Sequence, residues 1–191
     1  MVLAPNKALP GDKDKEDKVF RAGPAASYAS HQTSEKVTIG VKAYVDDEES
    51  KPVFGKHNPY NYGVLPVLVV IQNDSGKTIK VSPLEVVWML PDRDRVEATP
   101  AKDVRYLSPV KRPSPVQGPL PKLVGHKNPL DTWEIEGRAF SAEVLPPGQS
   151  ASGFFYFQTG YERGASLYVS GLREAGSGKE LLYFEIPVVE K

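Results

Sequence analysis

The sequence predicts an all-β fold, a sandwich of two antiparallel sheets with one short inserted helix. Seven or eight short apolar segments recur with turn residues between them, as in known sandwiches. Residues 36–45 alternate apolar and polar side chains, which is the period of a half-buried strand. The 191 residues include 18 prolines and 16 glycines, so many turns are expected.

The strands are expected in order along the chain. Residues 64–73 form an almost continuous apolar run rich in β-branched side chains, which predicts a central strand. Residues 78–82 should return antiparallel to it after a hairpin turn at residues 73–76. The other candidate strands are residues 84–90, 103–107, 140–150, 152–158, 166–172 and 179–189.

One helix is expected at residues 129–142. Asn128 can cap it, and Pro129 suits the first helical position. Trp133 and Phe140 fall on an apolar stripe at helical spacing, which predicts that Trp133 is buried. Trp88, in the apolar run of a predicted strand, is also expected to be a core residue. A strand over the same residues is the competing interpretation.

Two segments fall outside this pattern. Residues 1–35 include the mixed-charge run at residues 11–18 and cannot bury enough apolar surface to offset their ordering entropy. They are expected to be a disordered tether, with the folded domain at residues 36–191. Residues 108–129 hold six prolines and are expected to be a crossover loop, with a polyproline ligand as the alternative.

The tetrapeptide SGKT at residues 75–78 resembles the end of a phosphate-binding loop. The first glycine of that motif would stand at position 71, which is Ile71, and strand-forming residues follow where a helix is required. A turn is therefore expected there and no nucleotide. A second candidate, GSGK at residues 176–179, runs into another strand and is also interpreted as a turn.

Composition excludes several classes of function. The 24 basic and 24 acidic residues give a formal net charge of zero without a basic stripe, which argues against nucleic-acid binding. Cysteine is absent, so disulfides, thiolate catalysis and zinc–thiolate sites do not occur. No window has the apolar length of a membrane span, and no cofactor or metal site is expected.

Titratable residues give weak signals for chemistry. His31, His57 and His126 stand in separate loops without metal-ligand spacing and are expected to be solvated. Residues 45–50 contain four carboxylates and are expected to form a solvated acidic turn, with a calcium site as the alternative. Residues 91–97 should form a polar hairpin tip.

The loop at residues 51–63 combines aromatic side chains with hydrogen-bonding ones, as a surface that binds carbohydrate or peptide does. The alternative is that Phe54 and one tyrosine fold inward and close the end of the sandwich. The candidate ligand-binding residues are Phe54, His57, Asn58, Tyr60 and Tyr62.

Two segments carry a family resemblance. Residues 53–81 and the later residues 144–157, VLPPGQSASGFFYF, resemble uncharacterised secreted or lipid-anchored bacterial proteins. That resemblance covers about residues 36–189 and implies an immunoglobulin-like, telokin-like sandwich. It implies a periplasmic or extracellular protein whose N-terminal signal or anchor has been removed, although no lipobox cysteine is present. No catalytic residues carry over.

The function expected from these observations is a non-catalytic binding or structural module of the bacterial cell envelope. Its partner would be an unknown protein or carbohydrate of the envelope, and membrane contact would be limited to a removed anchor. The alternatives are a hydrolase or metal-dependent enzyme with a site assembled from loops, and a docking subunit of an envelope complex. A cytoplasmic location is the alternative compartment.

Overall fold

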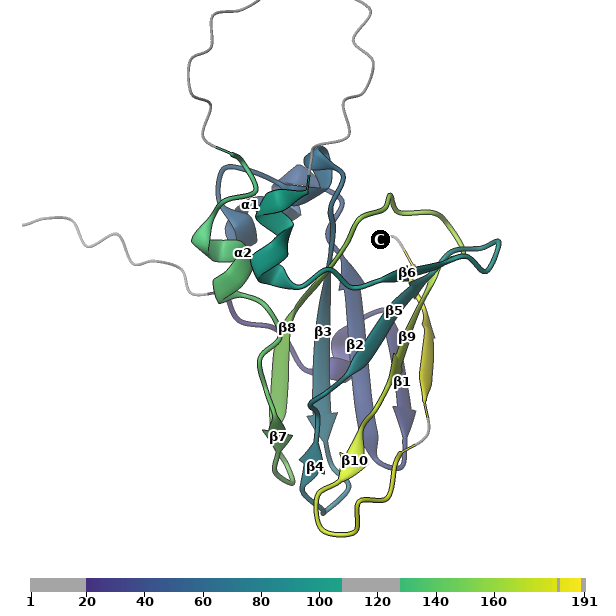
Figure 1. The fold of residues 1–191 in the computed structure, drawn as a ribbon. Coiled ribbons are helices and arrows are strands. Elements are labelled where there is room, and N and C mark those ends of the chain that lie inside the picture. Colours follow the sequence, from purple (N-terminus) through teal and green to yellow (C-terminus); the bar gives the residue numbers. More distant parts are fainter. Residues whose placement is uncertain (1–19, 108–127, 182, 190–191) are drawn as a thin grey trace, which may run out of the picture.

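The computed structural model describes residues 20–107, 128–181 and 183–189 as a mostly β structure with three antiparallel sheets and a few short helices (Figure 1). The all-β expectation is confirmed at this level, but the sheets number three and not two. The strands are β1 (Ser30–Ser34), β2 (Val37–Ala43), β3 (Leu65–Asn73), β4 (Ile79–Lys80), β5 (Glu85–Met89), β6 (Arg95–Glu97), β7 (Val144–Leu145), β8 (Ser150–Phe157), β9 (Ser166–Ser170), β10 (Arg173–Glu174) and β11 (Phe184–Pro187).

Two of the sheets have four strands each, in the orders β1-β2-β3-β8 and β11-β9-β5-β6. The first core lies between them, because apolar side chains of β2, β3 and β8 meet those of β5, β9 and β11. Trp88 is fully buried there and packs 5.9 Å from Phe157, between ring centroids. The prediction that Trp88 is a core residue is confirmed.

Strand β3 is central and buried on both faces, which explains its uninterrupted apolar sequence. Leu65, Val67, Val69 and Ile71 point into the first core. The intervening Leu68 and Val70 side chains point into a second core on the other face of the sheet. The period of two is therefore present, but it is hidden because both faces need apolar residues.

Short helices cover the second face of the first sheet. They are η1 (Ala25–Ser27), α1 (Asp47–Phe54), η2 (Pro59–Tyr62), η3 (Ala101–Tyr106) and α2 (Trp133–Gly137). Val53 and Phe54 from α1 and Ile135 from α2 contribute to the second core beside Phe154 and Tyr156 of β8. Figure 1 shows α1 and α2 together at the upper end of the sheets, with β4, β7 and β10 at the lower end.

The third sheet, β10-β4-β7, corrects the expected hairpin at residues 73–76. The turn is present, but the chain leaves the first sheet there, and β4 pairs with β10 and β7. Asn73 drives this change because its side chain is fully buried and donates to the Lys77 and Leu145 carbonyls at 2.7 and 2.9 Å. Asn73 also accepts from Ser75, so the SGKT resemblance reflects turn chemistry.

The expected tether is wrong for residues 20–35, whereas residues 1–19 lie outside the described part of the chain. Residues 30–34 form β1, which pairs along its whole length with β2. Gly40 of β2 lets η1 approach, since a Cβ at this position would lie 2.3 Å from the Ala25 carbonyl oxygen. Polar composition concealed this edge strand because only one of its residues, Ser30, is buried.

Three further expectations are corrected. The helix expected at residues 129–142 is limited to Trp133–Gly137, because residues 139–140 instead bond to Phe154 of β8. Residues 103–107 are not a strand, since most of them belong to η3. The acidic residues 45–50 begin α1 and do not form a simple turn.

Other expectations hold or cannot be followed. Of the polar hairpin tip expected at residues 91–97, residues 91–94 form the tip and residues 95–97 belong to β6. The turn expected at residues 176–179 lies at residues 175–177, after β10. The proline-rich connection falls almost entirely in residues 108–127, outside the described residues, and so does His126. Among the helices that the structure describes, none has the length and hydropathy needed to cross a bilayer.

Candidate functional site

Helix α1 shapes the end of the molecule where two surface grooves lie. Asp46 caps it by accepting hydrogen bonds from the Glu48 and Glu49 backbone N–H groups at 2.7 and 3.2 Å. Acidic residues fill its first turn, where the helix dipole favours negative charge. The helix ends at Gly55, whose φ of 70° favours glycine.

The first groove, here the Tyr62 groove, has a volume of about 290 Å³ and lies between α1 and η2. The Asp47 carboxylate organises it by accepting from Asn58 Nδ2 at 2.9 Å and from Asn61 Nδ2 at 2.8 Å. His57 Nδ1 lies 3.3 Å from the Tyr62 hydroxyl. The other lining residues are Lys51, Gly55 and Lys56.

The structure brings three of the five expected ligand-binding residues together in this groove, namely His57, Asn58 and Tyr62. Phe54 is only 2% exposed and packs in the second core, 4.9 Å from Phe154 between ring centroids. Tyr60 packs against the first core, and its hydroxyl accepts from the Tyr161 backbone N–H at 3.2 Å. Phe54 and one tyrosine, Tyr60, therefore turn inward, as the alternative interpretation of this loop proposed.

The second groove, here the Trp133 groove, has a volume of about 490 Å³ and lies on the other side of the α1 C-terminus. It shares Lys51 and Gly55 with the Tyr62 groove, so the two grooves are neighbours. Trp133 was expected in the core, and that prediction is wrong because its side chain is 69% exposed. The short helix α2 turns Ile135, and not Trp133, toward the second core.

Contacts with β8 and η3 hold α2 in place. The Tyr156 hydroxyl donates to the Ile135 carbonyl at 2.7 Å, and burial raises the pKa of this phenol well above its usual value. The Arg138 carbonyl accepts from the Phe154 N–H at 2.9 Å. On the outer side, Arg105 of η3 forms ion pairs with Asp131 and Glu136.

Arg138 is the main charge in the Trp133 groove. Its guanidinium carbon lies 5.6 Å from the Phe20 ring centroid and 5.9 Å from that of Trp133, so two aromatic rings flank the cation. Its Nε is buried without a hydrogen-bond acceptor in the described part of the chain. A buried donor without an acceptor costs about 1–3 kcal/mol.

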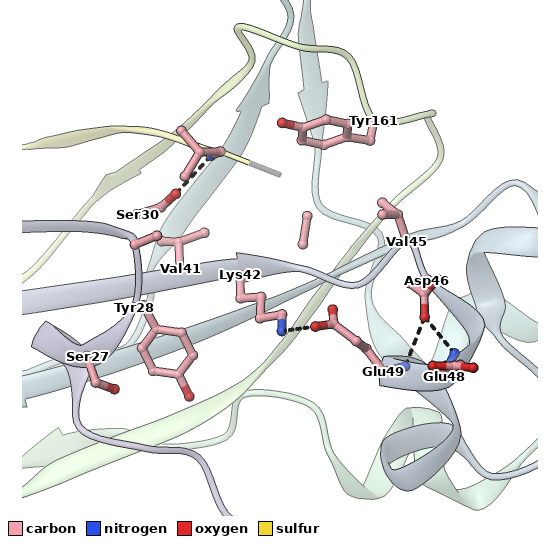
Figure 2. Close-up of a pocket in the computed structure, with 13 residues that line it drawn as sticks. Ser27, Tyr28, Ser30, Val41, Lys42, Val45, Asp46, Glu48, Glu49 and Tyr161 are labelled. Carbon is pink, nitrogen blue, oxygen red and sulfur yellow. Dashed lines mark hydrogen bonds and ion pairs between the residues drawn. The ribbon is translucent and has the colours of Figure 1, made fainter. Parts of the chain in front are cut away.

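A third groove, about 530 Å³, lies between η1, the end of β2 and the start of α1 (Figure 2). Most of its polar side chains already have partners. Lys42 Nζ pairs with Glu49 Oε1 at 2.7 Å, and Ser30 Oγ accepts from the Val189 N–H at 2.9 Å. The Tyr161 hydroxyl donates to the Val188 carbonyl at 3.0 Å. These contacts join β2 to α1 and tie the segment after β11 to Ser30 and Tyr161, which gives the groove a structural role.

Histidine–carboxylate pairs and metal-ligating clusters are not formed among the described residues. His57 meets a phenol, and His31 Nδ1 contacts the Tyr28 carbonyl at 2.7 Å, so neither forms a pair with a carboxylate there. No group of three or more His, Asp or Glu side chains in residues 20–107, 128–181 and 183–189 is placed to hold a metal ion. The arrangement at the α1 end is suited to binding by aromatic, amide and cationic side chains.

Sequence reasoning missed the pair formed by Trp133 and Arg138. Trp133 was assigned to an apolar stripe, although three charged residues, Glu134, Glu136 and Arg138, follow it within five positions. Gly137, four residues after Trp133, was the available signal that the indole could lie across a helix surface. The chain matches no protein-family model and no curated protein.

Proposed function

We propose that this protein is a non-catalytic binding module of the bacterial cell envelope, with an immunoglobulin-like, telokin-like sandwich as its scaffold. The observation that carries the proposal is the pair of neighbouring grooves at the end of α1. Side chains suited to recognition gather there, outside both cores, while the strands use their apolar side chains for packing. The envelope location, periplasmic or extracellular, rests on the resemblance of residues 53–81 and 144–157.

A loop-assembled enzyme is less well supported by the geometry. General acid–base catalysis uses a positioned side chain, most often a histidine or a carboxylate, that can reach the reacting group. Within the described residues, His57 lies beside Tyr62, and the Asp47 carboxylate is occupied by two asparagine amides. These contacts hold the Tyr62 groove in shape, which favours binding.

The experiment is a sedimentation assay with purified bacterial envelope fragments, complemented by a glycan array. The wild-type protein should bind, and Tyr62→Ala should weaken binding by about thirtyfold, since truncating an aromatic contact often costs about 2 kcal/mol. Tyr62 is preferred to Tyr60 because Tyr62 lines the groove, whereas the Tyr60 hydroxyl accepts from the Tyr161 backbone N–H.

Tyr183→Ala is the matched control, because Tyr183 is 55% exposed and packs on Tyr168 away from both grooves. This variant should bind like the wild type. Failure of the wild type to bind any envelope fragment or glycan would refute the proposal. Equal losses in Tyr62→Ala and Tyr183→Ala would refute the assignment of the α1 end.

A further inference from the structure

Trp133 is held as a flat platform by a glycine. A Cβ added at Gly137 would lie 3.0 Å from Trp133 Cε3 and 3.2 Å from Cζ3, so the indole lies directly against the backbone at position 137. Because the same side chain is 69% exposed, much of its surface remains open to solvent. A large aromatic surface of this kind, fixed in one orientation, loses little conformational entropy when a ligand packs on it.

Cationic groups flank the platform. Arg138 is held near the indole and has no ion-pair partner in the described part of the chain. Lys51, from α1, lines the same groove and likewise pairs with no carboxylate in that part of the chain. Glu134 is the one acidic residue of the lining, so the formal balance is two positive charges against one negative. The groove therefore favours a ligand with a negative group.

Hydroxyl groups complete the lining. Ser141 follows the segment that pairs with β8, and Ser152 lies on β8 itself, so both belong to rigid backbone. Hydroxyls can donate and accept hydrogen bonds, as can the hydroxyls of a sugar. The groove thus places an apolar platform, cations and hydroxyls around one space.

We propose that the Trp133 groove binds one ring of an acidic saccharide. The C–H face of the sugar would pack on the indole, its carboxylate would lie at Arg138, and its hydroxyls would reach Ser141 and Ser152. An acidic peptide side chain offers the carboxylate without a flat C–H face flanked by hydroxyls, so the saccharide fits the whole set better. This assignment rests on the proposed binding function and names the ligand class at the second of the two grooves.

The test titrates the protein with acidic oligosaccharides by calorimetry, using oligomers of galacturonate, glucuronate-containing hyaluronan and mannuronate. The methyl ester of the galacturonate trimer serves as the neutral counterpart, and triglutamate serves as the peptide probe. At least one acidic oligosaccharide should bind at least tenfold more tightly than triglutamate. If it is the galacturonate trimer, the methyl ester should bind at least tenfold more weakly. Binding should shift the emission of the exposed Trp133 to shorter wavelength.

Three variants separate the contributions. Trp133→Ala and Gly137→Ala should each weaken binding at least tenfold, since the first removes the platform and the second displaces it. Arg138→Gln should remove the preference for the acid over the ester. Gly176→Ala is the matched control for Gly137→Ala, because a Cβ at Gly176 meets no atom within 4 Å. Circular dichroism and thermal melting would verify that each variant is folded.

Several outcomes would overturn the inference. They are binding of none of the acidic oligosaccharides, equal binding of triglutamate, or unchanged affinity in Trp133→Ala. If the protein still binds envelope fragments through Tyr62 while Trp133→Ala has no effect, the saccharide inference fails and the proposed function stands. If the wild type binds neither fragments nor oligosaccharides, the proposed function fails with it.

Discussion

The two tryptophans should respond in opposite ways to the same substitution, although both were expected in the core. Trp88 is fully buried, and a buried tryptophan removes about 150–250 Å² from water, which corresponds to about 4–6 kcal/mol at ~25 cal/mol per Å². Its buried Nε1 has no acceptor in the described residues, so truncation also relieves a cost of about 1–3 kcal/mol. Trp88→Ala should therefore lower the free energy of unfolding by about 3 kcal/mol.

Trp133→Ala should cost far less. Its side chain is 69% exposed, so roughly a third of the same area is buried, which corresponds to about 1–2 kcal/mol. The assay is urea unfolding followed by far-UV circular dichroism, because both substitutions remove a fluorophore. Trp88→Phe, which keeps much of the volume and removes the unpaired N–H, should be milder than Trp88→Ala. Equal losses in the two alanine variants would refute the assignment of Trp133 to the surface.

Four further predictions concern stability. Gly40→Ala should lower the free energy of unfolding by about 1–3 kcal/mol, because the new Cβ would clash with the Ala25 carbonyl. Removal of residues 1–35 should lower the Tm by several degrees, because it removes β1, which pairs with β2. Thermal melting tests both changes, and an unchanged Tm would contradict them. Asn73→Ala should lower the free energy of unfolding by roughly 3 kcal/mol, since the buried Leu145 carbonyl and the backbone of the turn at residues 75–77 lose their partner. Urea unfolding measures this, and a cost near zero would mean that the turn holds without the Asn73 amide. The hydrogen bond from Lys77 lowers the pKa of Glu174 in the folded protein. The Glu174 carboxylate therefore stabilises the fold at pH values above its ordinary pKa of about 4.5, and this stabilisation is lost as the pH falls through the lowered pKa of the folded state. The stability difference between the wild type and Glu174→Gln should accordingly shrink below about pH 4.5, and a constant difference from pH 7 to 3 would argue against the pair.

The strand-rich class of the fold could be predicted from the sequence because its signals are local. The alternation at residues 36–45 and the run at residues 64–73 correspond to β2 and β3. Turn residues at 73–76 and 91–94 mark the positions where strands end. These signals depend on neighbours a few residues apart, and the chain retains them in any arrangement of the strands.

The candidate site was predicted only in part. His57, Asn58 and Tyr62 line a groove, as an exposed polar and aromatic loop would, but Phe54 and Tyr60 turn inward. An aromatic residue in a loop carries no local sign of which neighbour will cover it. That depends on contacts with residues such as Phe154, about a hundred positions away in the chain.

The sequence by itself determined where apolar runs lie along the chain and where the backbone turns. Tertiary structure decided which element covers each apolar face. Polar residues 30–34 became an edge strand because β2 offered free backbone groups to pair with. The turn at Asn73 led into a third sheet because its amide reaches the Leu145 carbonyl, far along the chain. Trp133 lies on the surface, and Ile135 from the same helix packs in the second core. Side chains compete for the limited volume of a closely packed interior, and the local sequence does not encode the outcome of that competition.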